Sequence, residues 1–131
     1  MYITRETDYG IRCVLYLARK AQEIAPVNEI AKAMHIPKSF LAKILQRLVK
    51  AGIVISGRGI SGGFSLAKKP KNISILDVIK AIQGNAAAIN MCAIDKRMCR
   101  LSNTCSVHPI WVELRGLIEK RLQKENFAKL I

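Results

Sequence analysis

The sequence predicts a mainly α-helical chain with one small β-hairpin, arranged as a winged helix-turn-helix followed by a long C-terminal helix. Three observations predict this class. Apolar residues recur at helical spacing through most of the chain. A short alternating run with a glycine-rich tip directly follows a closely spaced pair of these helices, and a helix with an apolar stripe comes last. With 131 residues, half of them hydrophobic, the chain can bury a substantial core.

The first helix is expected over residues 7–22. Thr7 is a good N-cap candidate, and Asp8 places a negative charge in the first turn, near the positive end of the helix dipole. Apolar side chains cover much of the helix circumference, so most of it should be buried. Cys13 lies within this apolar face and is interpreted as a small core residue.

Two further helices are predicted on either side of the tight turn MHIP. The first follows Pro26 and is capped by Asn28. The second has Pro37 at its first position and Gly52 just past its end, which is the usual placement of these two residue types. One side of the second helix is apolar and the other is basic. A helix pair of this kind is a helix-turn-helix.

A β-hairpin is predicted directly after the helix pair. Ile53–Ser56 and Phe64–Leu66 read as short strands around the tip GRGISGG, with Arg58 at the tip. A hairpin in this position is the wing of a winged helix. The glycine-rich run is not a phosphate-binding loop, because a strand rather than a helix follows it.

The last third of the chain is predicted to hold two helices around a polar segment. Ser74 caps a short helix that Gly84 ends. The cysteine-containing segment that follows is too polar and turn-rich for regular structure. The final helix has Pro109 in its first turn and a stripe that suits pairing with another helix, although it could also fold back on its own domain. The stripe consists of Trp111, Leu114, Ile118 and Leu122, with Ile110 and Leu117 beside it.

The chain is strongly basic, with a formal net charge of +13. Residues 1–80 carry fourteen Lys and Arg against five Asp and Glu, a net charge of +9. This charge favours a polyanionic partner, most commonly nucleic acid. No secretory signal is visible, and the longest uncharged run, residues 81–94, is too short and polar to span a bilayer. We therefore expect a cytoplasmic protein that binds double-stranded DNA and no membrane.

The predicted DNA-binding residues lie on the second helix of the pair and on the wing. Side chains such as Ser39, Lys43 and Gln46 would reach phosphates or base edges in the major groove, while Arg58 would enter the minor groove. A two-fold homodimer through the C-terminal helix would match two half-sites of a symmetric operator. The full predicted set is Lys38, Ser39, Phe40, Lys43, Gln46, Arg47, Arg58 and Ser61.

Three cysteines and a histidine gather within seventeen residues. Cys92, Cys99 and Cys105 are spaced Cys-x6-Cys-x5-Cys, and His108 follows three residues later. Such soft ligands indicate a metal or iron–sulfur site, or else a thiol switch. A zinc ion that only stabilises the loop, and a metal-free switch through a disulfide, both remain open. A Cys105–His108 nucleophile pair lacks any recognisable oxyanion loop or nucleotide motif, so we do not expect an enzyme.

Four stretches of the chain resemble the winged-helix iron–sulfur transcription regulators that include IscR and NsrR. They are MYITRETDYGIRCVLYLA, IPKSFLAKILQRLVKAGIV, RGISGGFSLA, and the three-cysteine loop leading into HPIWVELR. The resemblance implies a [2Fe-2S] or [4Fe-4S] cluster held by Cys92, Cys99 and Cys105. It also implies a fourth ligand: His108 matches the histidine of IscR-like members, and Asp8 matches the aspartate that NsrR-like members provide from the partner's first helix.

Two departures from the family pattern affect this expectation. The first cysteine gap is six residues, whereas IscR-like and NsrR-like members usually have five, and Ala42 stands where IscR carries a base-reading glutamate. The operator should therefore differ from that of IscR.

We expect a repressor whose cluster senses nitric oxide, redox state or iron supply and shifts the loop between Gly84 and Pro109. In this division, residues 1–83 bind DNA, residues 84–108 bind the cluster, and residues 109–131 form the dimerisation helix.

Overall fold

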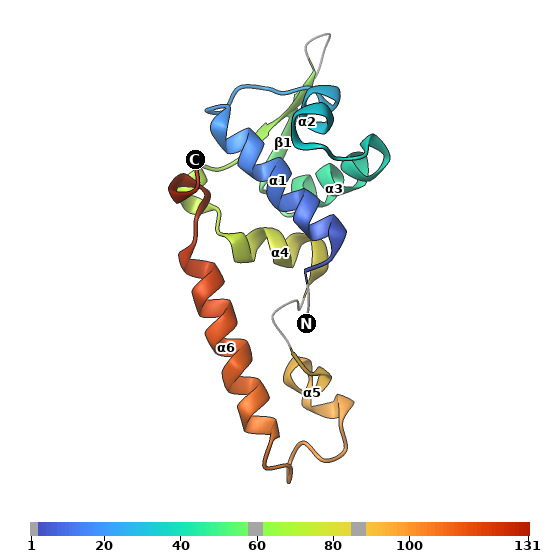
Figure 1. Ribbon diagram of the computed structural model, residues 1–131, viewed down its shortest axis with the longest axis vertical. Coiled ribbons are helices and arrows are strands. Elements are labelled where there is room, and N and C mark those ends of the chain that lie inside the picture. Colours follow the sequence, from blue (N-terminus) through green and yellow to red (C-terminus); the bar gives the residue numbers. More distant parts are fainter. Residues whose placement is uncertain (1–2, 58–61, 85–88) are drawn as a thin grey trace.

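A helical body and a β-hairpin form the N-terminal part of the protein. The computed structural model describes residues 3–57, 62–84 and 89–131. Figure 1 shows the hairpin beside the first three helices, and its first strand follows the third helix in the chain. The elements are α1 (Arg5–Arg19), α2 (Val27–Met34), α3 (Lys38–Lys50), β1 (Val54–Gly57) and β2 (Gly63–Leu66). The predicted fold class, a mainly helical chain with a small hairpin, is confirmed.

The C-terminal part begins with a helix that packs on this body, and its long last helix starts at a distance and returns to the body. Figure 1 shows α6 running toward the body, with α5 beside its far, N-terminal end. The cysteine-containing segment holds α5 and a short 3-10 turn, so the prediction that it lacks regular structure was wrong. The elements are η1 (Pro70–Asn72), α4 (Ile75–Gln83), α5 (Met91–Ile94), η2 (Lys96–Met98), α6 (His108–Lys124) and η3 (Phe127–Lys129).

The core of the body lies between α1, α3 and α4. Cys13 and Leu17 of α1 are completely buried, so the interpretation of Cys13 as a core residue is confirmed. The predicted apolar stripe of α3 also faces inward, with Leu41, Ile44, Leu45 and Leu48 buried. Removing these side chains from water supplies most of the stabilisation of a domain of this size.

Two predicted helix starts differ from the structure. The N-cap of α1 is Thr4, not Thr7: the Thr4 hydroxyl accepts a hydrogen bond from the Thr7 backbone N–H at 3.2 Å. Thr7 itself is buried one turn inside the helix. Helix α2 begins at Val27 after Pro26, one residue before the predicted cap Asn28. Its N-cap position is Pro26, which makes no side-chain cap hydrogen bond, so α2 starts without the predicted cap.

The wing is attached to the connection between α1 and α2. Strands β1 and β2 are antiparallel, with Val54 opposite Leu66 and Gly57 opposite Gly63. Phe64 and Ala25 exchange two backbone hydrogen bonds of 2.8 and 2.9 Å. A Cβ atom at Gly63 would lie 2.4 Å from the Ala25 carbonyl oxygen, so glycine is required there. The hairpin therefore has a fixed base.

The C-terminal end of the chain returns to the body. Helix α6 ends at Lys124 rather than continuing as the predicted helix did. The Ile75 N–H donates to the Glu125 carbonyl at 2.8 Å, and the Phe127 N–H donates to the Ile73 carbonyl at 3.1 Å. Phe127 is completely buried, so it anchors this end of α6. Within the described residues, no helix is both long enough and apolar enough to cross a membrane.

Candidate DNA-binding surface and cysteine segment

The outer side of α3 carries most of the residues that the sequence predicts to contact DNA. The apolar stripe of the helix faces the core, so helical spacing leaves the opposite side in solvent. The side chains there combine positive charge with hydroxyl and amide groups, which suit phosphate oxygens and base edges respectively. All six predicted residues of this helix are exposed: Lys38, Ser39, Phe40, Lys43, Gln46 and Arg47.

Phe40 differs from its neighbours because its ring also packs against α1. Its side chain is 44% exposed, and its ring centroid lies 6.1 Å from that of Tyr9. The Arg12 guanidinium lies 5.5 Å from the centroid of the same Tyr9 ring. An aromatic contact of this kind helps to fix the start of α3 on the body.

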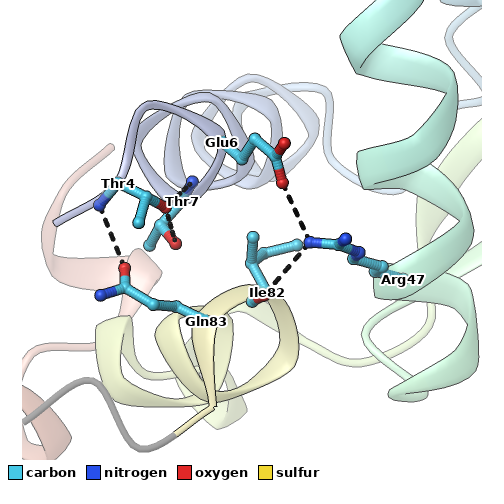
Figure 2. Close-up of polar contacts among 6 residues, drawn as sticks. All are labelled: Thr4, Glu6, Thr7, Arg47, Ile82 and Gln83. Atoms are coloured by element: carbon cyan, nitrogen blue, oxygen red, sulfur yellow. Dashed lines mark hydrogen bonds and ion pairs between the residues drawn. The ribbon is translucent and has the colours of Figure 1, made fainter.

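Arg47 is held by groups of the protein itself. Its guanidinium lies 3.0 Å from a carboxylate oxygen of Glu6 and donates to the Ile82 carbonyl at 3.2 Å (Figure 2). The sequence predicted a DNA contact for Arg47 from its place on the basic side of the helix. Its pairing with Glu6 spans 41 positions in the chain, and no local pattern indicates it.

The wing lies next to α3 in the sequence and packs against it. Ile55 on β1 is 52% exposed, so this strand presents part of its surface to solvent. The two wing residues predicted to bind DNA, Arg58 and Ser61, lie outside the described residues.

The three clustered cysteines have different surroundings. Cys92 lies on α5 and is buried, Cys99 follows η2 and is exposed, and Cys105 is half-buried; all three are free thiols. Across residues 3–57, 62–84 and 89–131, no three histidine, cysteine, aspartate or glutamate side chains lie close enough together to hold a metal ion. The structure therefore does not bring the predicted ligands into one site within a single chain.

His108 has an unusual environment for a polar side chain. It is the first residue of α6 and only 6% exposed, and its Nδ1 has no hydrogen-bond partner among the described residues. A buried polar atom without a partner is unfavourable. The nitrogen is therefore suited to a partner that the polypeptide does not supply. Three thiols and one imidazole are also donors that iron and zinc accept, so this residue set fits such a group.

Asp8 is separated from the cysteine segment within one chain. Its carboxylate pairs with Arg12 at 2.8 Å, and its side chain is 46% exposed. Figure 1 shows α1 in the body and α5 beside the far end of α6. A role for Asp8 at the cysteines would therefore need a second copy of the chain, as the resemblance to NsrR-like members implies.

Arg115 holds the start of the cysteine segment on α6. Its guanidinium donates to the Ala93 carbonyl at 2.5 Å and pairs with Glu119 at 3.0 Å. Ala93 follows Cys92, so this bond fixes α5 and the first cysteine on the long helix. We did not predict a role for Arg115; the only local signal is its spacing of four residues from Glu119, which is common on any exposed helix.

The cysteine environments predict an order of chemical reactivity. Burial raises the pKa of the Cys13 thiol to about 12, so this group stays protonated and unreactive near neutral pH. In metal-free folded protein, iodoacetamide should modify Cys99 first, Cys105 more slowly, and Cys13 only after unfolding. Mass spectrometry of the alkylated peptides over time would measure this order. Equal rates at Cys13 and Cys99 would contradict it.

Comparisons with known proteins agree with this architecture. The model of the Rrf2 family, described as an iron-dependent transcriptional regulator, matches residues 3–131. A protein of Aquifex aeolicus named as an HTH-type transcriptional regulator is 41% identical over 133 residues, covering 100% of this chain and 92% of the relative. The regulator NsrR of Bacillus subtilis is 30% identical over 145 residues, covering 100% and 97%.

Two solved structures show the same fold. IscR of T. potens superimposes with a TM-score of 0.78 and 22% identity, covering 99% of this chain and 85% of that chain. An oxidized form of CymR from Staphylococcus aureus gives a TM-score of 0.77 and 22% identity, covering 99% and 95%. With a family match over nearly the whole chain and full-length relatives at this identity, the chain belongs to the Rrf2 family of DNA-binding transcriptional regulators.

Proposed function

We propose that the protein is a cytoplasmic repressor that binds a two-fold symmetric DNA operator as a homodimer. The exposed basic side of α3 carries this proposal, because it joins Lys38 and Lys43 to the polar groups of Ser39 and Gln46. In this arrangement α3 enters the major groove, the lysines bind phosphates, and Gln46 reads base edges. The wing lies beside α3, and Arg58 at its tip would enter the minor groove.

The homodimer would form through the region of α5 and α6. This region exposes many large apolar side chains, and monomeric proteins rarely leave such a surface in water. A two-fold pairing of α6 with its copy would cover these side chains and place two α3 helices on one face of the DNA. The exposed residues are Met91, Ile94, Met98, Leu101, Val107, Ile110, Val112 and Leu117.

Control of DNA binding is assigned to an iron–sulfur cluster held by Cys92, Cys99 and Cys105. The Nδ1 of His108, which has no hydrogen-bond partner in the described part of the chain, supports this residue as a fourth ligand, and Asp8 of the partner subunit is the alternative. The cluster would react with nitric oxide or an oxidant, or would be lost when iron is scarce. Either change would signal the presence of nitric oxide, the redox state or the iron supply of the cell. Three thiolates with one nitrogen or oxygen ligand hold one iron less firmly than the others.

The chain itself would transmit the state of the cysteine segment to the DNA-binding body. Arg115 fixes α5 on α6 through the Ala93 carbonyl, while Phe127 fixes the other end of α6 on the body. A change in the segment between Gly84 and Pro109 would therefore act on a helix anchored at both ends. Because this helix would also join the two subunits, the change would alter the distance between the two α3 helices.

A metal-free thiol switch is the second candidate. Cys99 is exposed, so an oxidant can reach its thiol. A solved CymR structure of the same fold is an oxidized form. In this case a disulfide among Cys92, Cys99 and Cys105 would replace the cluster as the signal. A zinc ion on the same residues would instead stabilise the segment without sensing.

Metal analysis of two cysteine variants separates these candidates. We expect anaerobically purified protein to be brown, with matching iron and sulfide per subunit. Cys99→Ala should lose both because it removes one thiolate ligand, while the exposed position of Cys99 leaves the fold intact. The matched control Cys13→Ala should retain both. Visible spectra with iron, sulfide and zinc assays would measure this; zinc alone would indicate the structural metal, and absence of metal would indicate the thiol switch.

DNA affinity is then compared with and without the cluster. The probe is a duplex selected by the wild-type protein from a random pool. Wild-type affinity should fall by roughly 10³-fold or more between 50 and 200 mM salt, as expected for about six or more phosphate contacts. Equal affinities of the loaded wild type and Cys99→Ala would exclude control by the cluster while leaving DNA binding in place.

A further inference from the structure

Arg47 joins three helices at the base of the DNA-binding body. Its guanidinium reaches from the last turns of α3 to the Glu6 carboxylate in the first turn of α1 and to the Ile82 carbonyl in the last turn of α4 (Figure 2). The Thr4 N–H donates to the Gln83 side-chain oxygen at 3.1 Å and closes the junction between α1 and α4. We call these five residues the three-helix bridge.

The contacts of Arg47 satisfy groups that helices leave open at their ends. The last carbonyls of a helix have no partner within it, and Arg47 donates to one of them at Ile82. A positive charge is favourable at that C-terminal end of α4, and the negative charge of Glu6 is favourable at the N-terminal end of α1. The geometry therefore shows that Arg47 links α3 to the ends of α1 and α4.

We propose that Arg47 is a positioning residue that sets the angle of α3 on the body rather than a residue that contacts DNA. This inference rests on the proposed role of α3 in binding DNA. Lys43 lies one turn before Arg47 on the same helix, and Gln46 directly precedes Arg47 in the chain. A small rotation of α3 would move both side chains relative to the groove. The contacts of Arg47 with Glu6 and Ile82 hold its guanidinium against α1 and α4.

Breaking the Arg47–Glu6 pair should change the free energy of unfolding only modestly, because the pair is partly exposed. The side chains of Arg47 and Glu6 are 48% and 42% exposed, and exposed ion pairs contribute little to stability. The bridge should therefore affect how accurately α3 is held more than whether the protein folds. The appropriate readout is the ratio of affinities for a selected duplex and a scrambled duplex, which a change in stability alone does not alter.

The test uses Arg47→Ala, Glu6→Gln, their combination, and Lys43→Ala as a matched control on α3. The probes are the duplex selected by the wild type and a scrambled duplex of equal composition. Glu6→Gln removes a negative charge, so electrostatics alone should strengthen binding to both duplexes. Positioning predicts instead that the ratio of selected to scrambled affinity falls about threefold in either single variant. The double variant should lose no more than either single one, because both break the same contact.

Salt dependence provides an independent readout. Lys43→Ala should reduce the salt slope by about one phosphate contact, whereas Arg47→Ala should leave it unchanged. If Arg47→Ala lowers the slope like Lys43→Ala and Glu6→Gln strengthens binding without changing the ratio, the positioning role is wrong and Arg47 binds phosphate. Glu6→Gln keeps the shape of its side chain, so it decides the question even if Arg47→Ala unfolds. Failure of the wild type to bind the duplexes would instead reject the proposed function of α3.

Discussion

Replacing Phe127 with alanine is expected to lower the free energy of unfolding by about 3–5 kcal/mol. The Phe127 side chain is completely buried. The short helix η3 that carries it packs against α1 and η1, and its backbone N–H is bonded to Ile73. Alanine would leave a cavity in the body and release the end of α6. The loss therefore combines the transfer of an aromatic ring to water with the cavity that remains.

Urea unfolding followed by circular dichroism would measure this loss as a lower midpoint. The neighbouring variant Leu130→Ala is the matched control, because Leu130 is 39% exposed and should change the midpoint little. Similar midpoints for Phe127→Ala and the wild type would mean that the C-terminal end of the chain is not anchored as the structure shows.

Most of the DNA-binding body could be predicted from local patterns. The apolar stripe of α3 repeats at helical spacing, so its buried side and its exposed basic side both follow from the sequence. The glycine-rich tip and the alternation on either side of it predict the hairpin. In these elements the local preference and the tertiary packing agree, which is why the two strands were placed to within one residue.

Features that depend on distant parts of the chain could not be predicted. The contact of Arg47 with Glu6 and the burial of Phe127 both arise from tertiary packing. The apolar stripe of the last helix suggested either self-association or folding back on the domain. The structure shows that the end of the chain folds back at Phe127, while exposed apolar residues such as Leu117 remain on α6.

The cysteine segment was predictable in composition but not in geometry. The spacing of Cys92, Cys99 and Cys105 indicated their chemistry, since thiols in this number are rarely needed for packing alone. Spacing alone does not predict that Cys92 is buried on α5 while Cys99 is exposed and Cys105 half-buried. The structure adds one feature of His108 to the sequence: its side chain is buried, and its Nδ1 has no hydrogen-bond partner among the described residues.

A negative charge at Leu117 is expected to abolish the homodimer and to weaken binding to a two-fold operator by about 10²-fold or more. Leu117 is 56% exposed on α6, in the region of exposed apolar residues that we assign to the dimer interface. Leu117→Glu would place an unpaired carboxylate in that interface, which is strongly unfavourable. Without the dimer, the second half-site loses the high effective concentration that linkage provides.

Gln123→Glu is the matched control, because it makes the same charge change at an exposed polar position of the same helix. It should leave both the dimer and the affinity nearly unchanged. Sedimentation equilibrium would measure the oligomeric state, and titration of duplexes with one or two half-sites would measure the affinity. Leu117→Glu should bind the single half-site as the wild-type subunit does, because its α3 surface is unaltered. A dimeric Leu117→Glu protein with full affinity would place the interface elsewhere than on this face of α6, and the spacing of the two α3 helices would then be set by other contacts.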